Sequence, residues 1–193
     1  MLDSQIMDQP KIYQEIQRKS KEVGFTMPSD LYVGSLLKTL MLSKPNGRFL
    51  EMGTGIGLSL SWMIDGMGPG SRLVSVDSDS DLIEIVSGYF GADKRVELVC
   101  QDGSEWIRSY EGAHFDLIFA DAWPGKYSEI DEMLRLLTIG GFYIVDDMTA
   151  QPNWPEGHED NVGRLVGYLE GRDDLVLTKL NWSTGLIVAV KTK

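Results

Sequence analysis

The 193-residue sequence has one cysteine, two histidines and no apolar run near the ~18 residues that span a bilayer. A single cysteine excludes a disulfide framework within the chain. Cys100 ends the apolar run Val96–Cys100, so we interpret it as a small core residue of a buried strand rather than a nucleophile. The first residues are polar and lack the apolar stretch of a signal peptide. These absences predict a cytoplasmic protein.

Positive charge is also scarce. The chain has 18 Lys and Arg residues against 29 Asp and Glu residues, a formal net charge of −11. Such an acidic protein repels phosphate backbones and anionic lipid, which disfavours nucleic-acid and membrane partners and leaves a small molecule as the expected one. The length suits one domain, 1–193. Within it we expect N-terminal helices at 1–45, a cofactor-binding core at 46–150, and a substrate loop with C-terminal strands at 151–193.

Apolar runs alternate with helical patterns over most of the chain, which predicts a parallel sheet with helices on both faces. These runs are apolar rather than alternating, as in strands buried on both sides. The last two apolar runs are separated by only a short connection, so these two strands must pair antiparallel with each other. The predicted fold is α/β, a doubly wound, mostly parallel seven-stranded sheet with a C-terminal antiparallel strand. Strands are expected at 48–52, 73–76, 96–100, 115–120, 142–145, 175–180 and 186–190. Helices are expected at 10–23, 79–90, 104–110, 127–137 and 160–169. Two more are expected, one that starts after a cap at Ser29 and one that follows the first strand and ends near residue 67.

A glycine loop, 51–57, follows the first of these strands directly. Glycines let the backbone take positive φ and approach a ligand closely. The loop does not match the dinucleotide fingerprint, because Leu58 and Leu60 stand where the two possible registers need glycine. Asp77 ends the second strand, where a carboxylate can accept hydrogen bonds from ribose hydroxyls. Asp102 follows the third strand and could accept from an adenine amine; helix capping is the alternative for both aspartates.

The segment 49–57, Phe-Leu-Glu-Met-Gly-Thr-Gly-Ile-Gly, resembles the first motif of the Rossmann-like S-adenosylmethionine methyltransferases. Within them it is similar to the small O-methyltransferases related to catechol and caffeoyl-coenzyme A O-methyltransferase. The resemblance implies S-adenosylmethionine as cofactor, a small-molecule methyl acceptor and a homodimer. It also implies that Asp77 holds the ribose and Asp102 the adenine side. The other cofactor-binding residues that it implies are Glu51, Gly53, Thr54, Gly55, Gly57 and, in the helix start that closes over the cofactor, Met27.

Three further aspartates follow the fourth and fifth predicted strands. Asp121 comes directly after 115–120, and Asp146 and Asp147 directly after 142–145, so all three should gather at one sheet edge. Hard oxygen ligands of this type suit Mg²⁺ or another divalent cation. In the resembled family, metal-dependent members use such a cation to bind two vicinal oxygens of a catechol-like substrate. Capping and ordinary strand-end carboxylates are the alternative interpretation.

The sequence departs from that family at two positions. Asp147 stands where the family has asparagine, and Pro124 occupies the slot of its catalytic lysine. Lys126 lies two residues later and is our candidate for the catalytic lysine, with a solvated loop lysine as the alternative. Asp121 is the other catalytic candidate. These departures leave metal-assisted and metal-independent transfer both open.

The loop 151–158 follows the fifth strand and carries recognition-type side chains. Trp154 is a candidate to stack an aromatic acceptor, and His158 is a candidate base or ligand, with a surface histidine as its alternative. Two further functions stay open: spermidine-synthase-like aminopropyl transfer and cofactor binding without turnover.

Overall fold

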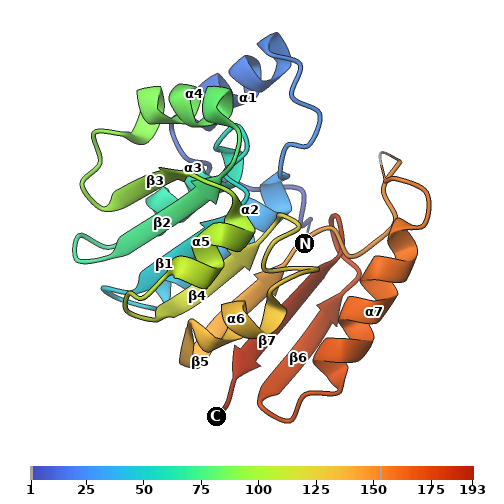
Figure 1. Ribbon diagram of the computed structural model, residues 1–193. Helices are drawn as coiled ribbons and strands as arrows, with labels where there is room; N and C mark the ends of the chain where they lie inside the picture. Colours follow the sequence, from blue (N-terminus) through green and yellow to red (C-terminus); the bar gives the residue numbers. More distant parts are fainter. Residues whose placement is uncertain (1, 153) are drawn as a thin grey trace. The chain divides into compact units, whose positions relative to one another are not determined.

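The computed structural model of the chain describes residues 2–152 and 154–193. It contains a seven-stranded sheet with the strand order β3-β2-β1-β4-β5-β7-β6, in which the C-terminal strand is antiparallel to both of its neighbours (Figure 1). The predicted fold class is therefore confirmed. Two compact units, divided after Asp102, make up the chain; the predicted domain organisation stays a prediction. No helix within the described residues is both long and apolar enough to cross a membrane.

The first unit places three parallel strand ends side by side. Met52 at the end of β1 pairs with Val76 on β2, and Asp77 at the end of β2 pairs with Cys100 on β3. The glycine loop therefore leaves β1 beside the carboxylate of Asp77. The elements of this unit are α1 (Tyr13–Glu22), α2 (Leu31–Leu42), β1 (Arg48–Met52), α3 (Leu58–Asp65), β2 (Arg72–Asp77), α4 (Ser80–Phe90) and β3 (Val96–Cys100).

Two predictions fail in this unit. Cys100 is exposed, and β3 as a whole is only partly buried. An edge strand has a neighbour on one side only, so its apolar side chains are not enclosed as those of central strands are. The cap of α2 is Asp30 rather than Ser29. The carboxylate of Asp30 accepts hydrogen bonds of 2.9 Å from the backbone N–H groups of Tyr32 and Val33.

The second unit combines one parallel and two antiparallel pairings. Ala120 at the end of β4 pairs with Val145 at the end of β5, so the residues that follow them emerge next to each other. β7 pairs antiparallel with β6, as predicted, and also with β5. The elements are α5 (Gly103–Ser109), β4 (Phe115–Ala120), α6 (Ile130–Arg135), β5 (Leu137–Val145), α7 (His158–Glu170), β6 (Leu175–Leu180) and β7 (Leu186–Lys191).

The helix predicted at 127–137 is wrong at both ends. α6 covers only Ile130–Arg135, and β5 begins at Leu137 instead of after Gly141. Leu137 pairs with Phe115, and the register of the pair shifts before Leu117. Tertiary pairing thus extends β5 through two glycines that sequence alone reads as a helix stop.

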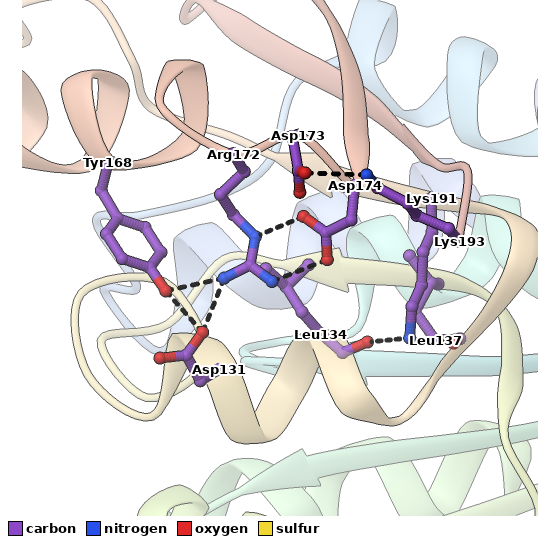
Figure 2. A network of polar contacts seen from close by, with 9 residues as sticks. All are labelled: Asp131, Leu134, Leu137, Tyr168, Arg172, Asp173, Asp174, Lys191 and Lys193. Carbon is purple, nitrogen blue, oxygen red and sulfur yellow. Dashed lines mark hydrogen bonds and ion pairs between the residues drawn. The ribbon is translucent and has the colours of Figure 1, made fainter.

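A polar network joins α6, α7 and the last strands of the second unit (Figure 2). The guanidinium of Arg172 donates two hydrogen bonds, of 2.8 and 2.7 Å, to the carboxylate of Asp174. It also contacts Asp131 on α6 at 2.6 Å and the hydroxyl of Tyr168 on α7 at 2.7 Å. Lys191 donates to two backbone carbonyls at the junction of α6 and β5. One arginine therefore connects three chain segments with planar, charge-assisted bonds.

We predict that Arg172→Met lowers the free energy of unfolding by about 1–2 kcal/mol, because it removes a bidentate pair that is mostly shielded from water. Lys179→Met is the matched control: its ion pair with Glu170 is about half exposed, so its loss should change stability by about 0.5 kcal/mol or less. Urea unfolding of both variants measures the difference. Equal effects in the two variants would show that the Arg172 network contributes no more than a surface ion pair.

Candidate active site

The glycine loop of the first unit is held in a conformation that needs glycine. Gly53, Gly55 and Gly57 have φ values of +96°, +51° and +88°. Gly57 is the N-cap of α3, and a Cβ there would lie 3.2 Å from the side chain of Val86. The backbone of Gly53 and Gly55 is partly exposed at the carboxyl end of β1, next to the N-terminus of α3. In open α/β sheets this is where the phosphate or sugar of a nucleotide ligand binds.

Asp77 ties this loop to the neighbouring strand. One carboxylate oxygen of Asp77 accepts a hydrogen bond of 2.9 Å from the backbone N–H of Gly55. The other accepts one of 3.0 Å from the N–H of Asp79, which itself caps α4. Asp77 remains partly exposed. Its oxygens have lone pairs beyond these two bonds, so the carboxylate can orient the loop and still accept hydrogen bonds from a ligand.

Glu51 lies beneath the loop and is completely buried. Its two oxygens accept hydrogen bonds of 2.6 Å from Ser59 and 2.5 Å from Ser75, and Ser75 in turn bonds the buried hydroxyl of Thr54 at 2.6 Å. Burial raises the pKa of Glu51 to about 7, against the opposing effect of the two serine hydroxyls. Glu51 therefore supports the loop from below through Ser59 and Ser75. Neither serine was predicted from the sequence.

The segment before β1 contacts the loop through a residue that the sequence analysis missed. The ring of Phe25 lies against Gly55, 3.0 Å from where a Cβ would stand. The predicted residue, Met27, is 67% exposed and belongs to the same segment. A cavity of about 380 Å³ adjoins this segment, with Phe25 and Leu58 in its wall. Asp102, the last residue of the first unit, is exposed two positions beyond the end of β3. The roles of Met27 and Asp102 stay predictions.

The second unit gathers the aspartates at the ends of β4 and β5. Asp121 and Asp146 follow the paired residues Ala120 and Val145, and the N–H of Asp146 lies 3.4 Å from the carbonyl of Ala120. Asp146 is 2% exposed and accepts hydrogen bonds from the N–H of Asp147 at 2.7 Å and from the hydroxyl of Thr184. Burial raises its pKa to about 6, and the bond from Thr184 opposes this rise. Thr184, in the turn between β6 and β7, is another residue that the sequence analysis missed.

Lys126 is buried beside these carboxylates, with 4% of its surface exposed. Burial lowers the pKa of Lys126, and the charges of Asp121, Asp147 and Asp146 oppose that effect. Its ammonium also lies 5.0 Å from the centre of the Tyr127 ring. The alternative interpretation of a solvated loop lysine is therefore wrong, because the side chain points inward.

The predicted metal site does not form in this arrangement. Among residues 2–152 and 154–193, no cluster of three or more histidine, cysteine or acidic side chains is placed to hold a metal ion. The charge that faces the three aspartates is the ammonium of Lys126. The donor atoms suit a hard cation by chemistry, but the ammonium of Lys126 beside them repels one.

An aromatic cluster lies next to Lys126. It consists of Trp123, Tyr127, Trp154 and His158, with ring centres 4.6 to 6.1 Å apart between neighbours. The hydroxyl of Tyr127 lies 3.1 Å from Nε2 of His158, the first residue of α7. The structure thus brings both predicted substrate residues, Trp154 and His158, to one place. A cavity of about 450 Å³ shares Trp123 and Tyr127 with this cluster and is otherwise lined by α7 and Ile130. Asn153, in the same loop, lies outside the described residues.

The model of a family described as "Methyltransferase domain" matches residues 50–148, about half of the chain. This chain belongs to that methyltransferase family. A protein of Mycobacterium tuberculosis, named as an inferred O-methyltransferase, is 29% identical over 118 residues, which are 58% of this chain and 53% of that protein. The chain spans about half the length of the curated relatives it matches.

Solved structures share the fold of this methyltransferase domain. The O-methyltransferase TomG from Streptomyces achromogenes, in complex with S-adenosylmethionine, superposes with a TM-score of 0.85 at 22% identity and covers 99% of this chain and 94% of its own. An O-methyltransferase from Bacillus cereus, in complex with S-adenosylhomocysteine, gives a TM-score of 0.83 at 19% identity, with 98% and 94% covered. At these identities the likeness establishes the fold alone.

The buried Glu51 predicts a pH dependence of stability. Its folded pKa, about 7, lies above the usual value of 4.5, so the folded state retains a proton that the unfolded state releases as pH rises between these values. The contribution of Glu51 to stability is therefore greatest below pH 4.5 and falls until about pH 7. We expect Glu51→Gln, which keeps partners for both serines, to gain up to about 3 kcal/mol relative to the wild type over this range. Urea unfolding at pH 5 and pH 7.5 tests this; a difference independent of pH would contradict it.

Proposed function

We propose that this methyltransferase domain transfers a methyl group from S-adenosylmethionine to a hydroxyl group of a small aromatic molecule. The observation that carries the proposal is the bond between Asp77 and the N–H of Gly55. It fixes a partly exposed carboxylate against a glycine-rich loop at the ends of β1 and β2, in a chain of this family. S-adenosylmethionine supplies an activated methyl group on a positively charged sulfur.

The cofactor-binding role of the first unit follows from its chemistry. The partly exposed Asp77 has free acceptor capacity for the ribose hydroxyls, while the partly exposed backbone of Gly53 and Gly55 leaves room for a close ligand. Glu51 and Thr54 keep the loop in place from below, through Ser59 and Ser75. Rigid support of this kind positions the reacting group, and positioning supplies much of the rate of methyl transfer.

The second unit supplies the groups for the acceptor. In the transfer, the hydroxyl oxygen forms a bond to the methyl carbon as the carbon–sulfur bond breaks, and the hydroxyl proton passes to a base. We propose His158 as that base, because its half-buried imidazole lies in the aromatic cluster, whereas the ammonium of Lys126 is enclosed. Trp154 and Trp123 offer ring faces to an aromatic acceptor, and the 450 Å³ cavity beside them is of a size for a small molecule. The homodimer stays a prediction.

A metal-independent transfer is the form that we propose, since the three aspartates face the ammonium of Lys126, which repels a divalent cation. Metal-assisted transfer is the second form. An excess of chelator separates the two, because it would abolish only the metal-assisted reaction. Competition with decarboxylated S-adenosylmethionine tests aminopropyl transfer, which requires that compound to bind more tightly than S-adenosylmethionine. A screen of phenols and catechols with labelled cofactor tests cofactor binding without turnover, which requires that no acceptor becomes labelled.

We expect Asp77→Ala to weaken S-adenosylmethionine binding by roughly 10- to 100-fold, because hydrogen bonds to a charged group contribute about 1.5–3 kcal/mol each. Isothermal titration calorimetry measures the affinity. Asp81→Ala, on the neighbouring helix α4, removes the same charge without touching the loop and is the matched control. Wild-type chain that binds no S-adenosylmethionine would overturn the proposed function, and equal affinity in Asp77→Ala would remove Asp77 from the site.

Substitution of each histidine tests the proposed base. General-base catalysis contributes about 100-fold or more, so His158→Gln should lower kcat by at least that factor while cofactor affinity stays the same. His114→Gln is the control, because His114 is exposed and precedes β4, outside the aromatic cluster. Initial rates with the best acceptor of the phenol screen give both values. Wild-type kcat in His158→Gln would rule out the role of this histidine.

A further inference from the structure

Lys126 reaches the aspartates because a tight turn sends it inward. The carbonyl of Trp123 accepts hydrogen bonds from the N–H groups of Lys126 and Tyr127, at 3.2 and 2.8 Å. Gly125 has φ +80°, and a Cβ there would come within 2.6 Å of the side chain of Met133. The buried hydroxyl of Tyr143, on β5, donates to the carbonyl of Gly125. The position of Lys126 is thus fixed from β5 and α6, not by its own side chain.

The charges around Lys126 come from two strand ends. Asp121 follows β4, and Asp146 and Asp147 follow β5. Asp146 is buried, and Asp121 and Asp147 are partly exposed, so the negative charges that follow the two strands repel each other unless a cation lies beside them. All three act electrostatically on the Lys126 ammonium, and burial leaves that ammonium little access to water.

We propose that Lys126 is the built-in cation of this site, which takes the place of a divalent metal ion and prevents one from binding. Asp147, which stands where the resembled family has asparagine, adds a negative charge that a lysine at this place requires. Because the ammonium is enclosed, Lys126 acts as a positioning residue that keeps the aspartates together, rather than as a group that touches the acceptor. The inference concerns the same site as the proposed function and rests on it for its catalytic meaning.

Metal binding to lysine variants tests this inference without any measurement of turnover. Wild-type chain titrated with Mn²⁺ should show no specific binding. Lys126→Met removes the cation and leaves the carboxylates, so it should bind one Mn²⁺ per chain at least about tenfold more tightly than the wild type. Lys191→Met is the matched control: this lysine bonds two backbone carbonyls, so its loss creates no carboxylate cluster and should create no Mn²⁺ affinity.

A second variant covers the case in which three uncompensated carboxylates prevent folding. Lys126→Met with Asp147→Asn removes one charge of each sign and restores the acidic pattern of the resembled family, so it should fold and bind Mn²⁺. Circular dichroism establishes folding. Specific Mn²⁺ binding by the wild type, or a folded double variant without Mn²⁺ affinity, would overturn the inference. Calorimetry with S-adenosylmethionine on the same wild-type sample tests the proposed function separately, because cofactor affinity does not depend on the Mn²⁺ result.

Discussion

A carboxylate withdrawn from water needs hydrogen-bond donors or a cation, and both halves of this chain depend on that requirement. In the first unit, Glu51 is enclosed and two serine hydroxyls satisfy its oxygens. In the second, Asp146 is enclosed, bonded by Thr184 and faced by the Lys126 ammonium. These partners come from segments distant in sequence, so the correct fold must form before the carboxylates are compensated. Each acidic group thereby holds a loop at a strand end in one conformation.

The parallel pairing of strands determines which acidic groups meet. Side-by-side ends of β1 and β2 bring Asp77 to the N–H of Gly55, and those of β4 and β5 bring Asp121 next to Asp146. Within each unit, the same topological feature places polar groups where ligands of α/β sheets bind. The two sets differ in their electrostatics. The first remains partly exposed and offers acceptors to a neutral sugar, whereas the second is closed around an internal lysine.

Much of the fold was predictable because the apolar runs and helical patterns of the sequence coincide with the segments that pack as strands and helices. The strands from 48–52 to 186–190 were located to within a few residues, except where β5 begins at Leu137. That error and the exposed Cys100 have one physical origin: the number of neighbours of a strand, and the length over which it pairs, depend on the whole sheet. Phe25 illustrates the same limit at the site, since nothing in its sequence neighbourhood indicates contact with Gly55.

Local sequence patterns were enough to locate the polar groups at the strand ends. Residue types and spacing placed the glycine loop, Asp77 and the later aspartates at the ends of successive strands, because side chains that follow parallel strands must emerge at one edge. The charge compensation of those groups, in contrast, depends on contacts made in the folded chain. The turn held by Tyr143 and Met133 directs Lys126 inward, and the β6–β7 turn brings Thr184 to Asp146. Whether aspartates bind a metal ion or a lysine depends on a contact between distant segments, which no local pattern records.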